Sequence, residues 1–373
     1  MNPWDWKGAD GLPGVLLDLA RGSDEGGRVG VVGLAKNCGK TTTLNALLRA
    51  AATRNIRTGV TSGGRDGELY DAITGLPKPA IHLHPGALVA LADYTIGSTS
   101  CQLEILQRTG IHTPAGEIVV AEALGPGFVE IFGCNRGDDL ARAVRELRRV
   151  GAELVLVDGA AGRTFLANPD VVGSFVIATG AAMDTDIDSA AAETMHALHV
   201  FTLPWPEEAL RARAMSLVQR GMSAVVEPEG SVRTLPWATL LGREEELTEG
   251  LGPDDVALIC ARAVGDRLLE TLGLWLARRR RQRPQARFEV IAADPSKIAA
   301  GSQTVCRFED AGGALKVLKR ARVIAITCNP SSPSGAGYDP MDFVRRVSEV
   351  VDNLPVFDLV AGLAGLGGVV FEA

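Results

Sequence analysis

The chain has 373 residues, 43 of them glycine, and a formal net charge of −7. Hydrophobic residues make up 46% and charged residues 22%, which is ordinary for a globular protein and excludes whole-chain disorder or a collagen repeat. The acidic balance argues against nonspecific nucleic-acid binding, because such binding depends on neutralising phosphates. We therefore expect a folded protein of about two domains with no nucleic-acid partner.

The cysteines and the N-terminus indicate a cytoplasmic location. The six cysteines are scattered and no two form a C-x-x-C pair, which is typical of a chain in a reducing compartment. The first eleven residues carry Asp5 and Asp10 and lack an apolar core, so we expect no signal peptide. Since no run of about 18 apolar residues occurs, we also expect no membrane span and no membrane partner.

Short apolar runs alternate with helical patterns through the first 200 residues. After a short amphipathic segment at 12–21, the patterns predict strands at 28–33, 58–61, 80–83, 153–157 and 174–178, a hairpin of 118–123 with 128–132, and helices at 42–52 and 138–150. The strands at 28–33, 153–157 and 174–178 are nearly all apolar. Strands of this kind lie in parallel sheets that helices cover on both faces.

Beyond residue 200 the alternation is weaker, and it predicts a second, smaller α/β domain. Strands are predicted at 199–202, 288–291, 322–327 and 356–360, and helices at 207–220, 256–281, 312–321 and 340–351. We expect an N-terminal segment over 1–25, a parallel-sheet α/β domain over 26–200 and a C-terminal α/β domain over 201–373.

The strongest motif is the stretch Gly33-Leu-Ala-Lys-Asn-Cys-Gly-Lys-Thr-Thr42, which follows a predicted strand and opens a predicted helix. In this setting backbone N–H groups and the helix N-terminus form an anion site. Lys40 would reach the β- and γ-phosphates of ATP, and the Thr41 hydroxyl would ligate Mg²⁺. The predicted nucleotide-binding residues are Gly33, Lys36, Asn37, Cys38, Gly39, Lys40, Thr41 and Thr42.

The spacing departs from the Walker pattern, because five residues separate Gly33 from Gly39. This arrangement resembles the loop of dethiobiotin synthetase and its relatives. In the nitrogenase-iron-protein branch a second lysine lies four residues before the glycine of the Gly-Lys pair, but here that position is Ala35. The dimer chemistry of that branch is therefore not carried over, and a homodimer stays an open alternative.

Two further acidic positions follow predicted strands. Asp158 ends the strand at 153–157 and would sit near Mg²⁺, with Gly159 leaving room beside the γ-phosphate; the alternative is a plain helix cap. This segment resembles the one at the same place in dethiobiotin synthetase. Asp66 follows the strand at 58–61 and would position water or a metal-bound ligand, or else form an Asp-Gly turn. We place Lys40, Asp158 and Asp66 in the catalytic set, and Thr41 and Asp158 as metal ligands.

Several stretches together resemble a narrower family. These are the phosphate loop, Val60–Glu68, Thr113–Ile118, Val157–Ala160 and Ile326–Pro333. They look like the P-loop subunit encoded beside lysine 5,6-aminomutase and regarded as a reactivase component. The resemblance implies a P-loop NTPase with Mg²⁺-dependent ATP hydrolysis, coupled to reactivation of a cobalamin-dependent aminomutase. The alternatives are an ATP-dependent small-molecule ligase or kinase of the dethiobiotin synthetase type, and a nucleotide-sensing interaction module.

Overall fold

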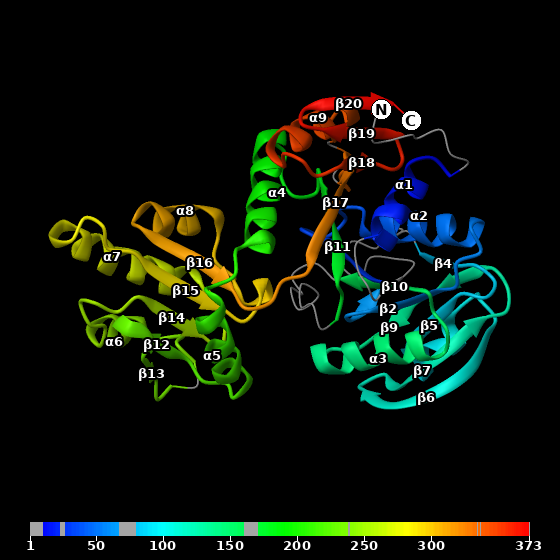
Figure 1. The fold of residues 1–373 in the computed structure, drawn as a ribbon. Coiled ribbons are helices and arrows are strands. Elements are labelled where there is room, and N and C mark those ends of the chain that lie inside the picture. Colours follow the sequence, from blue (N-terminus) through cyan, green and yellow to red (C-terminus); the bar gives the residue numbers. More distant parts are fainter. Residues whose placement is uncertain are drawn as a thin grey trace. The chain divides into compact units, whose positions relative to one another are not determined.

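The computed structural model describes residues 10–22, 27–66, 80–159, 171–237, 239–333, 335 and 337–372, with the side chains of Arg65 and Asp66 excepted. Figure 1 shows the chain as a ribbon of helices and strands. Its contacts divide it into two compact units. Unit 1 is formed by Met1–Leu198 with Ala321–Ala373, and unit 2 by His199–Arg320.

Unit 1 is an α/β fold built on a large, mostly parallel sheet. Among the described residues, its strands lie in the order β20-β19-β18-β17-β11-β1-β10-β2-β5-β7-β6. Their bounds are β1 Arg28–Gly33, β2 Thr58–Ser62, β5 Leu88–Ala92, β6 Leu103–Thr113, β7 Gly116–Ala123, β10 Leu154–Gly159, β11 Ser174–Gly180, β17 Arg322–Asn329, β18 Val356–Asp358, β19 Leu363–Leu366 and β20 Val369–Glu372. The strands from β18 to β5 run parallel, and the remaining strands extend both edges antiparallel.

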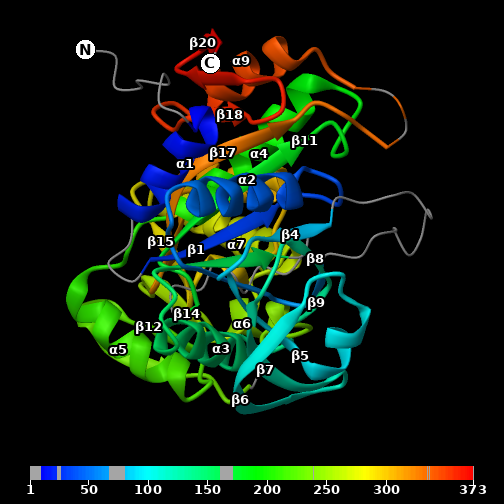
Figure 2. The same ribbon diagram turned by 90° about the vertical axis from the view of Figure 1, so that its right-hand side faces the viewer.

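Helices cover both faces of the parallel strands (Figures 1 and 2). The helices of unit 1 are α1 Gly11–Gly22, α2 Lys40–Thr53, α3 Gly137–Arg149 and α9 Pro340–Val350, and α4 Ile187–Thr202 begins in unit 1. Leu16 of α1, Leu47 of α2 and Val31 of β1 belong to one buried cluster. On the other face, Leu147 of α3 lies against Gly59 of β2. Burial on both faces explains why these strands read as apolar runs.

The predicted hairpin of 118–123 with 128–132 is wrong. β7 pairs with β5 and β6, whereas β8 (Gly127–Val129) pairs with β4 (Ile81–Leu83), and β9 (Ile131–Phe132) pairs with β3 (Arg65–Asp66). The glycine-rich turn at 125–127 is a local signal, but the partners of the strands that flank it are distant in sequence. The hairpin in this region is β6–β7, which turns between Thr113 and Gly116.

The division of the chain also differs from the predicted domains. β17 pairs in parallel with β11 from Ser174↔Arg322 to Gly180↔Asn329, so the residues after Ala321 return to the sheet of unit 1. The residues predicted as a separate N-terminal segment include α1, which packs into the core of unit 1 through Leu12, Leu16 and Leu17. Unit 2 is thus an insertion and not the C-terminal part of the chain.

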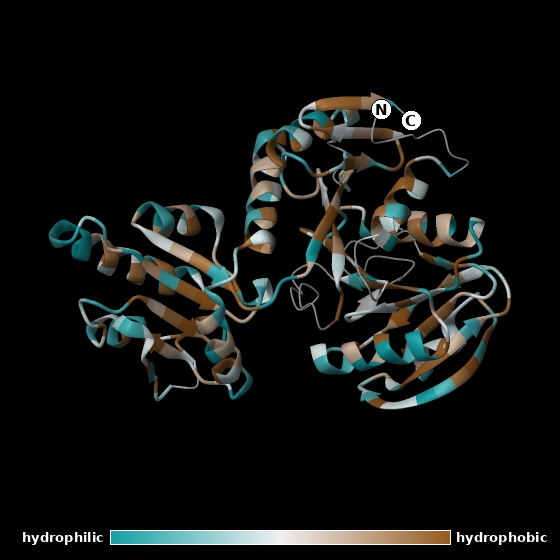
Figure 3. Cartoon of the chain, viewed as in Figure 1, coloured by the Kyte–Doolittle hydropathy of each residue, from teal (hydrophilic) through white to brown (hydrophobic). Residues whose placement is uncertain are grey.

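Unit 2 is a smaller α/β unit with its own core. Its sheet has the order β13-β12-β14-β15-β16, in which β14, β15 and β16 are parallel. Its elements are α5 Glu208–Gln219, β12 Ala224–Val226, β13 Val232–Thr234, α6 Glu244–Glu249, β14 Ala257–Cys260, α7 Asp266–Gln282, β15 Phe288–Ala292, α8 Ser302–Asp310 and β16 Gly313–Val317, with short 3₁₀ turns at Pro228–Gly230 and Pro295–Lys297. Apolar side chains from α7, α8 and the sheet form one cluster, as the brown strands in Figure 3 illustrate.

Three sequence predictions in this region are wrong. The strand predicted at 199–202 is the end of α4, and the helix predicted at 256–281 is β14 followed by α7. The helix predicted at 312–321 is β16, in which Leu315 and Val317 are buried while Lys316 pairs with Glu289. Short apolar runs do not separate strand from helix by periodicity alone, because packing against neighbours decides between them.

Among the described residues, no helix is both long and apolar enough to cross a membrane.

Position 133 needs glycine because the backbone of Ser62 passes too close to leave room for a side chain. A Cβ atom at this position would lie 1.8 Å from the carbonyl oxygen of Ser62, at the end of β2. We expect Gly133→Ala to lower the free energy of unfolding by about 1–3 kcal/mol through overpacking, as measured by urea titration. Gly125→Ala is the matched control, because a Cβ there meets nothing within 4 Å. Equal stability of the two variants would contradict this account.

Candidate functional site

The loop between β1 and α2 lies at the carboxyl end of a central strand, which is where parallel sheets bind ligands. Two residues turn the chain through the left-handed region, Asn37 with φ 65° and Gly39 with φ 88°. A Cβ on Gly33 would lie 2.7 Å from the Lys40 side chain, so only glycine lets that side chain fold back over the end of β1. The sequence therefore shapes a tight loop around Lys40.

Lys40 and Asp158 form an ion pair at the sheet edge. β10 lies directly beside β1, with Val31 opposite Asp158 and Val32 opposite Gly159. The Lys40 ammonium lies 3.1 Å from Asp158 Oδ1, and the Asp158 side chain is fully buried. The backbone oxygen of Asp158 accepts a hydrogen bond from Gly63 N, which ties the loop after β2 to the same place. The structure thus brings together two of the three residues that the sequence placed in the catalytic set, Lys40 and Asp158.

The start of α2 is suited to an anion. Among the described residues, no side chain caps this 14-residue helix, and its first turn carries no acidic residue. The first N–H groups of a helix have no intrahelical partner, and the helix dipole adds partial positive charge there. With Lys40 as its first residue, the helix presents backbone donors and an ammonium group at one point. Phosphate and carboxylate groups bind readily in this arrangement.

Asn329 is a site residue whose position the sequence did not predict. The sequence assigned the loop after β17 to a second α/β unit, but β17 lies in the sheet of unit 1. The Asn329 side chain donates a hydrogen bond from Nδ2 to the Asn37 carbonyl oxygen at 2.8 Å, which supports the loop between β1 and α2. Behind the loop, the Thr43 and Thr327 hydroxyls lie 2.8 Å apart. The available signal was an apolar strand followed by Asn-Pro-Ser-Ser, but the pattern did not reveal its partner strand.

Cys38 lies inside the loop and is buried. A Cβ atom added to Gly180 would lie 3.3 Å from the Cα of Cys38, so the end of β11 packs closely against the loop after β1. Burial raises the pKa of the Cys38 thiol to about 11. Burial also raises the pKa of Cys328 well above its usual value, with Asp358 and Cys38 adding to the effect. Cys38 is therefore a neutral packing residue of the loop at physiological pH.

Two recesses flank the loop. One of about 440 Å³ is lined by Lys36, Asn37, Asp184 and Tyr338, among others. The Tyr338 hydroxyl lies 2.5 Å from the Asp184 carbonyl oxygen and 3.1 Å from that of Asp186, so its single proton is donated to one or shared between them, which holds the wall of this recess in place. The other recess, of about 30 Å³, lies beside Gly39, Thr42, Asn329, Leu359 and Val360.

The remaining predicted residues are placed as follows. Thr41 and Thr42 are partly exposed in the first turn of α2, and Gly159 ends β10 beside Val32. The backbone of Asp66 pairs with Ile131, whereas its side chain lies outside the described part of the chain. Among the described residues, no group of three or more His, Cys, Asp or Glu side chains could hold a metal ion. Mg²⁺ fits this donor set only together with phosphate, because it needs few carboxylates besides phosphate oxygens and water.

Comparison of the chain with protein-family models, with curated proteins and with solved structures finds no significant match. The class that the described residues define is an α/β protein with a mixed, mostly parallel sheet and an inserted smaller α/β unit.

The cysteines provide a test of the loop's packing. At pH 8 a thiol with a pKa of about 11 is ionised in about one molecule in a thousand, and the thiolate is the reactive form. We expect iodoacetamide to modify the exposed Cys306 first and Cys38 far more slowly, as followed by peptide mass spectrometry. Raising the pH toward 10 should accelerate the reaction of Cys38. The protein unfolded in urea is the control, and equal rates at the two cysteines in the folded protein would show that the loop is open.

Proposed function

We propose that unit 1 binds ATP with Mg²⁺ at the loop between β1 and α2 and hydrolyses it. The observation that carries this proposal is the contact of 3.1 Å between the Lys40 ammonium and buried Asp158 at the ends of adjacent parallel strands. A cation and a carboxylate at this position match what a triphosphate and its metal ion require. The uncapped start of α2 supplies the remaining donors.

In this proposal each residue of the site has a separate role in binding and hydrolysis. Lys40 would turn from Asp158 toward the β- and γ-phosphates, which frees the carboxylate for the metal ion. Thr41 would add a hydroxyl ligand, and Mg²⁺ when bound would neutralise phosphate charge. Asp66 follows Gly63 and Gly64 on the neighbouring segment, where it would orient the attacking water. Positioning and charge stabilisation account for most of the catalysis in this kind of reaction.

In this proposal, the strand order also indicates which way the bound nucleotide would point along the edge of the sheet. Lys40 and Asp158 lie on the β10 side of the loop, so the γ-phosphate would point that way. The nucleoside would then lie on the opposite side, toward the ends of β17 and β18. The small recess beside Asn329 and Val360 lies there, and a base would have to widen it.

Replacement of Lys40 tests the loop assignment. We expect Lys40→Ala to abolish tight MgATP binding, a loss of about 100-fold in affinity, because a charge-assisted contact to phosphate disappears. Lys36→Ala is the control within the same loop, and its loss should be much smaller. Calorimetric titration measures both variants, and retained tight binding in Lys40→Ala would overturn the assignment.

Folding needs a separate check, because Lys40→Ala leaves the carboxylate of buried Asp158 without this ammonium. The double variant Lys40→Met with Asp158→Asn removes both charges together. It should unfold at a temperature near that of the wild type and still fail to bind MgATP.

We further propose that hydrolysis is coupled to reactivation of a cobalamin-dependent aminomutase. The support for this partner is the family resemblance of the phosphate loop and four other stretches. In such a system, two nucleotide states with different affinities for the partner would drive the release of damaged cofactor. The chain would then act as a nucleotide-dependent switch.

The partner proposal predicts a slow basal ATPase that rises when a cobalamin-dependent aminomutase is added. Phosphate release, measured with and without lysine 5,6-aminomutase, checks this expectation, and the Lys40→Ala variant provides the background rate. An ATPase rate that does not respond to the aminomutase would remove this partner while leaving nucleotide binding intact.

A specific observation favours a second candidate, an ATP-dependent small-molecule ligase or kinase. The recess of about 440 Å³ beside Lys36 and Asn37 has room for a small polar acceptor, and Lys36 and Asp184 give it charges of both signs. This candidate requires ADP release that depends on a small molecule and needs no protein partner. A nucleotide-sensing module would bind ATP and show neither response.

A further inference from the structure

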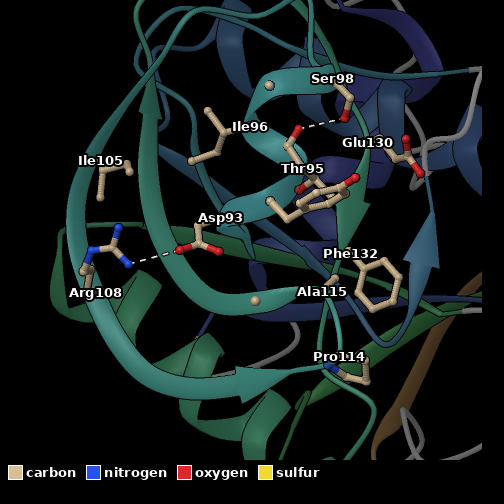
Figure 4. Close-up of a pocket in the computed structure, with 13 residues that line it drawn as sticks. Asp93, Thr95, Ile96, Ser98, Ile105, Arg108, Pro114, Ala115, Glu130 and Phe132 are labelled. Carbon is tan, nitrogen blue, oxygen red and sulfur yellow. Dashed lines mark hydrogen bonds and ion pairs between the residues drawn. The ribbon is translucent and has the colours of Figure 1, made fainter.

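A further recess of unit 1 is lined by residues outside the loop between β1 and α2. It has a volume of about 1020 Å³ and is formed by the segment after β5, the β6–β7 hairpin and β9 (Figure 4). In the sheet order β1-β10-β2-β5, three strand spacings separate β1 from β5, which is about 14 Å. None of the residues that line the recess belongs to the loop between β1 and α2 or to β10. The recess is thus a site of its own.

The walls of the recess are mainly apolar. Ile96 packs against the core from the 3₁₀ segment Asp93–Ser98, and Phe132 lies across from Ile105 (Figure 4). Tyr94 is 83% exposed and Ile105 is 43% exposed, so apolar surface that would gain from a ligand faces solvent. Pockets for small organic molecules are lined in this way, with a few polar groups that fix orientation.

Asp93 and Arg108 line the recess, and Glu117, which adjoins it, joins them in a cluster with an excess of negative charge. A single nitrogen of Arg108, Nη1, donates to Asp93 Oδ2 at 3.1 Å and to Glu117 Oε2 at 2.8 Å. Two carboxylates therefore share one guanidinium. Hydrogen bonds to Glu117 and Asp93 raise the pKa of Arg108, while the Gly110 N–H and Arg108 lower the pKa of Glu117, so Arg108 and Glu117 stay charged at neutral pH. The cluster has a net charge of −1, which attracts a cation and disfavours an anion.

We infer that this recess binds a small organic ammonium ion that carries an apolar or aromatic body. The body would rest on Ile96, Ile105 and Phe132, and the ammonium group would approach Asp93. Aromatic faces at Tyr94 and Phe132 add cation–π attraction. The inference does not depend on nucleotide binding, because no residue of the phosphate loop takes part.

The wall of the recess adjoins the segment that follows β2. Phe132 pairs with Arg65 and Ile131 with Asp66, and Gly133 N donates to the Gly64 carbonyl oxygen at 2.6 Å. A ligand that orders Phe132 therefore acts on a strand that is hydrogen-bonded to the backbone of Asp66. The binding inference stands by itself, whereas an effect of the ligand on the reaction through Asp66 rests on the proposed function.

The test uses three probes of similar size and different charge on the full-length protein without nucleotide. The probes are 2-phenylethylammonium, neutral 2-phenylethanol and anionic 3-phenylpropionate, and saturation-transfer NMR titration gives their affinities. We expect the ammonium probe to bind most tightly, with the anion weakest. Tighter or equal binding of the anion or the alcohol, or no binding of any probe at about 10 mM, would overturn the inference.

Two variants with opposite expected effects locate the site. Asp93→Asn should weaken binding of the ammonium probe about two- to fivefold, as expected for a partly exposed ion pair. Arg108→Gln removes the competing cation and should strengthen it by a similar factor. Glu104→Gln, on β6 outside the recess, removes the same charge as Asp93→Asn and should have no effect. Equal affinities in all three variants would show that the probe binds elsewhere.

Discussion

The parallel pairing of β1 with β10 is the constraint on which the site depends. It sets Val32 beside Gly159 and Val31 beside Asp158, so the end of β1 and the carboxylate reach the same edge of the sheet. A shift of one residue would turn every side chain of β10 to the other face. The shift would take Asp158 away from Lys40 and place apolar side chains at the edge. The core that fixes this register therefore also fixes the site.

The ion pair at this edge has an energetic consequence. Asp158 is fully buried and the Lys40 side chain is only 12% exposed. Bringing both charges out of water is costly, and their attraction offsets this cost only with good geometry. A buried pair of this kind adds little net stability, although removing one partner costs about 3–5 kcal/mol. An anion at the start of α2 would give Lys40 a second partner, so the pair is suited to exchange of partners.

Local sequence predicted the central part of unit 1 well. β1, α2 and the tight loop between them follow from an apolar strand, glycines and a helix that are contiguous in the chain, and Asp158 follows from its place at the end of a second apolar strand. The position of Asn329 did not follow, because β17 pairs with β11 across the whole of unit 2. Apolar periodicity shows that Arg322–Asn329 is a strand but not which neighbour it takes. β16 was predicted as a helix for a related reason, since its five residues are too few to establish a period.

The place of the insertion explains how the fold accommodates unit 2. β11 and β17 are adjacent and parallel, and α4 follows β11 as the first part of the crossover between them. Parallel neighbours need such a connection, which commonly holds a single helix. Here the connection leaves unit 1 near Leu198 and re-enters at Ala321, just before β17 begins. At the carboxyl edge, Asn329 at the end of β17 reaches the loop after β1, and its hydrogen bond to the Asn37 carbonyl oxygen supports that loop.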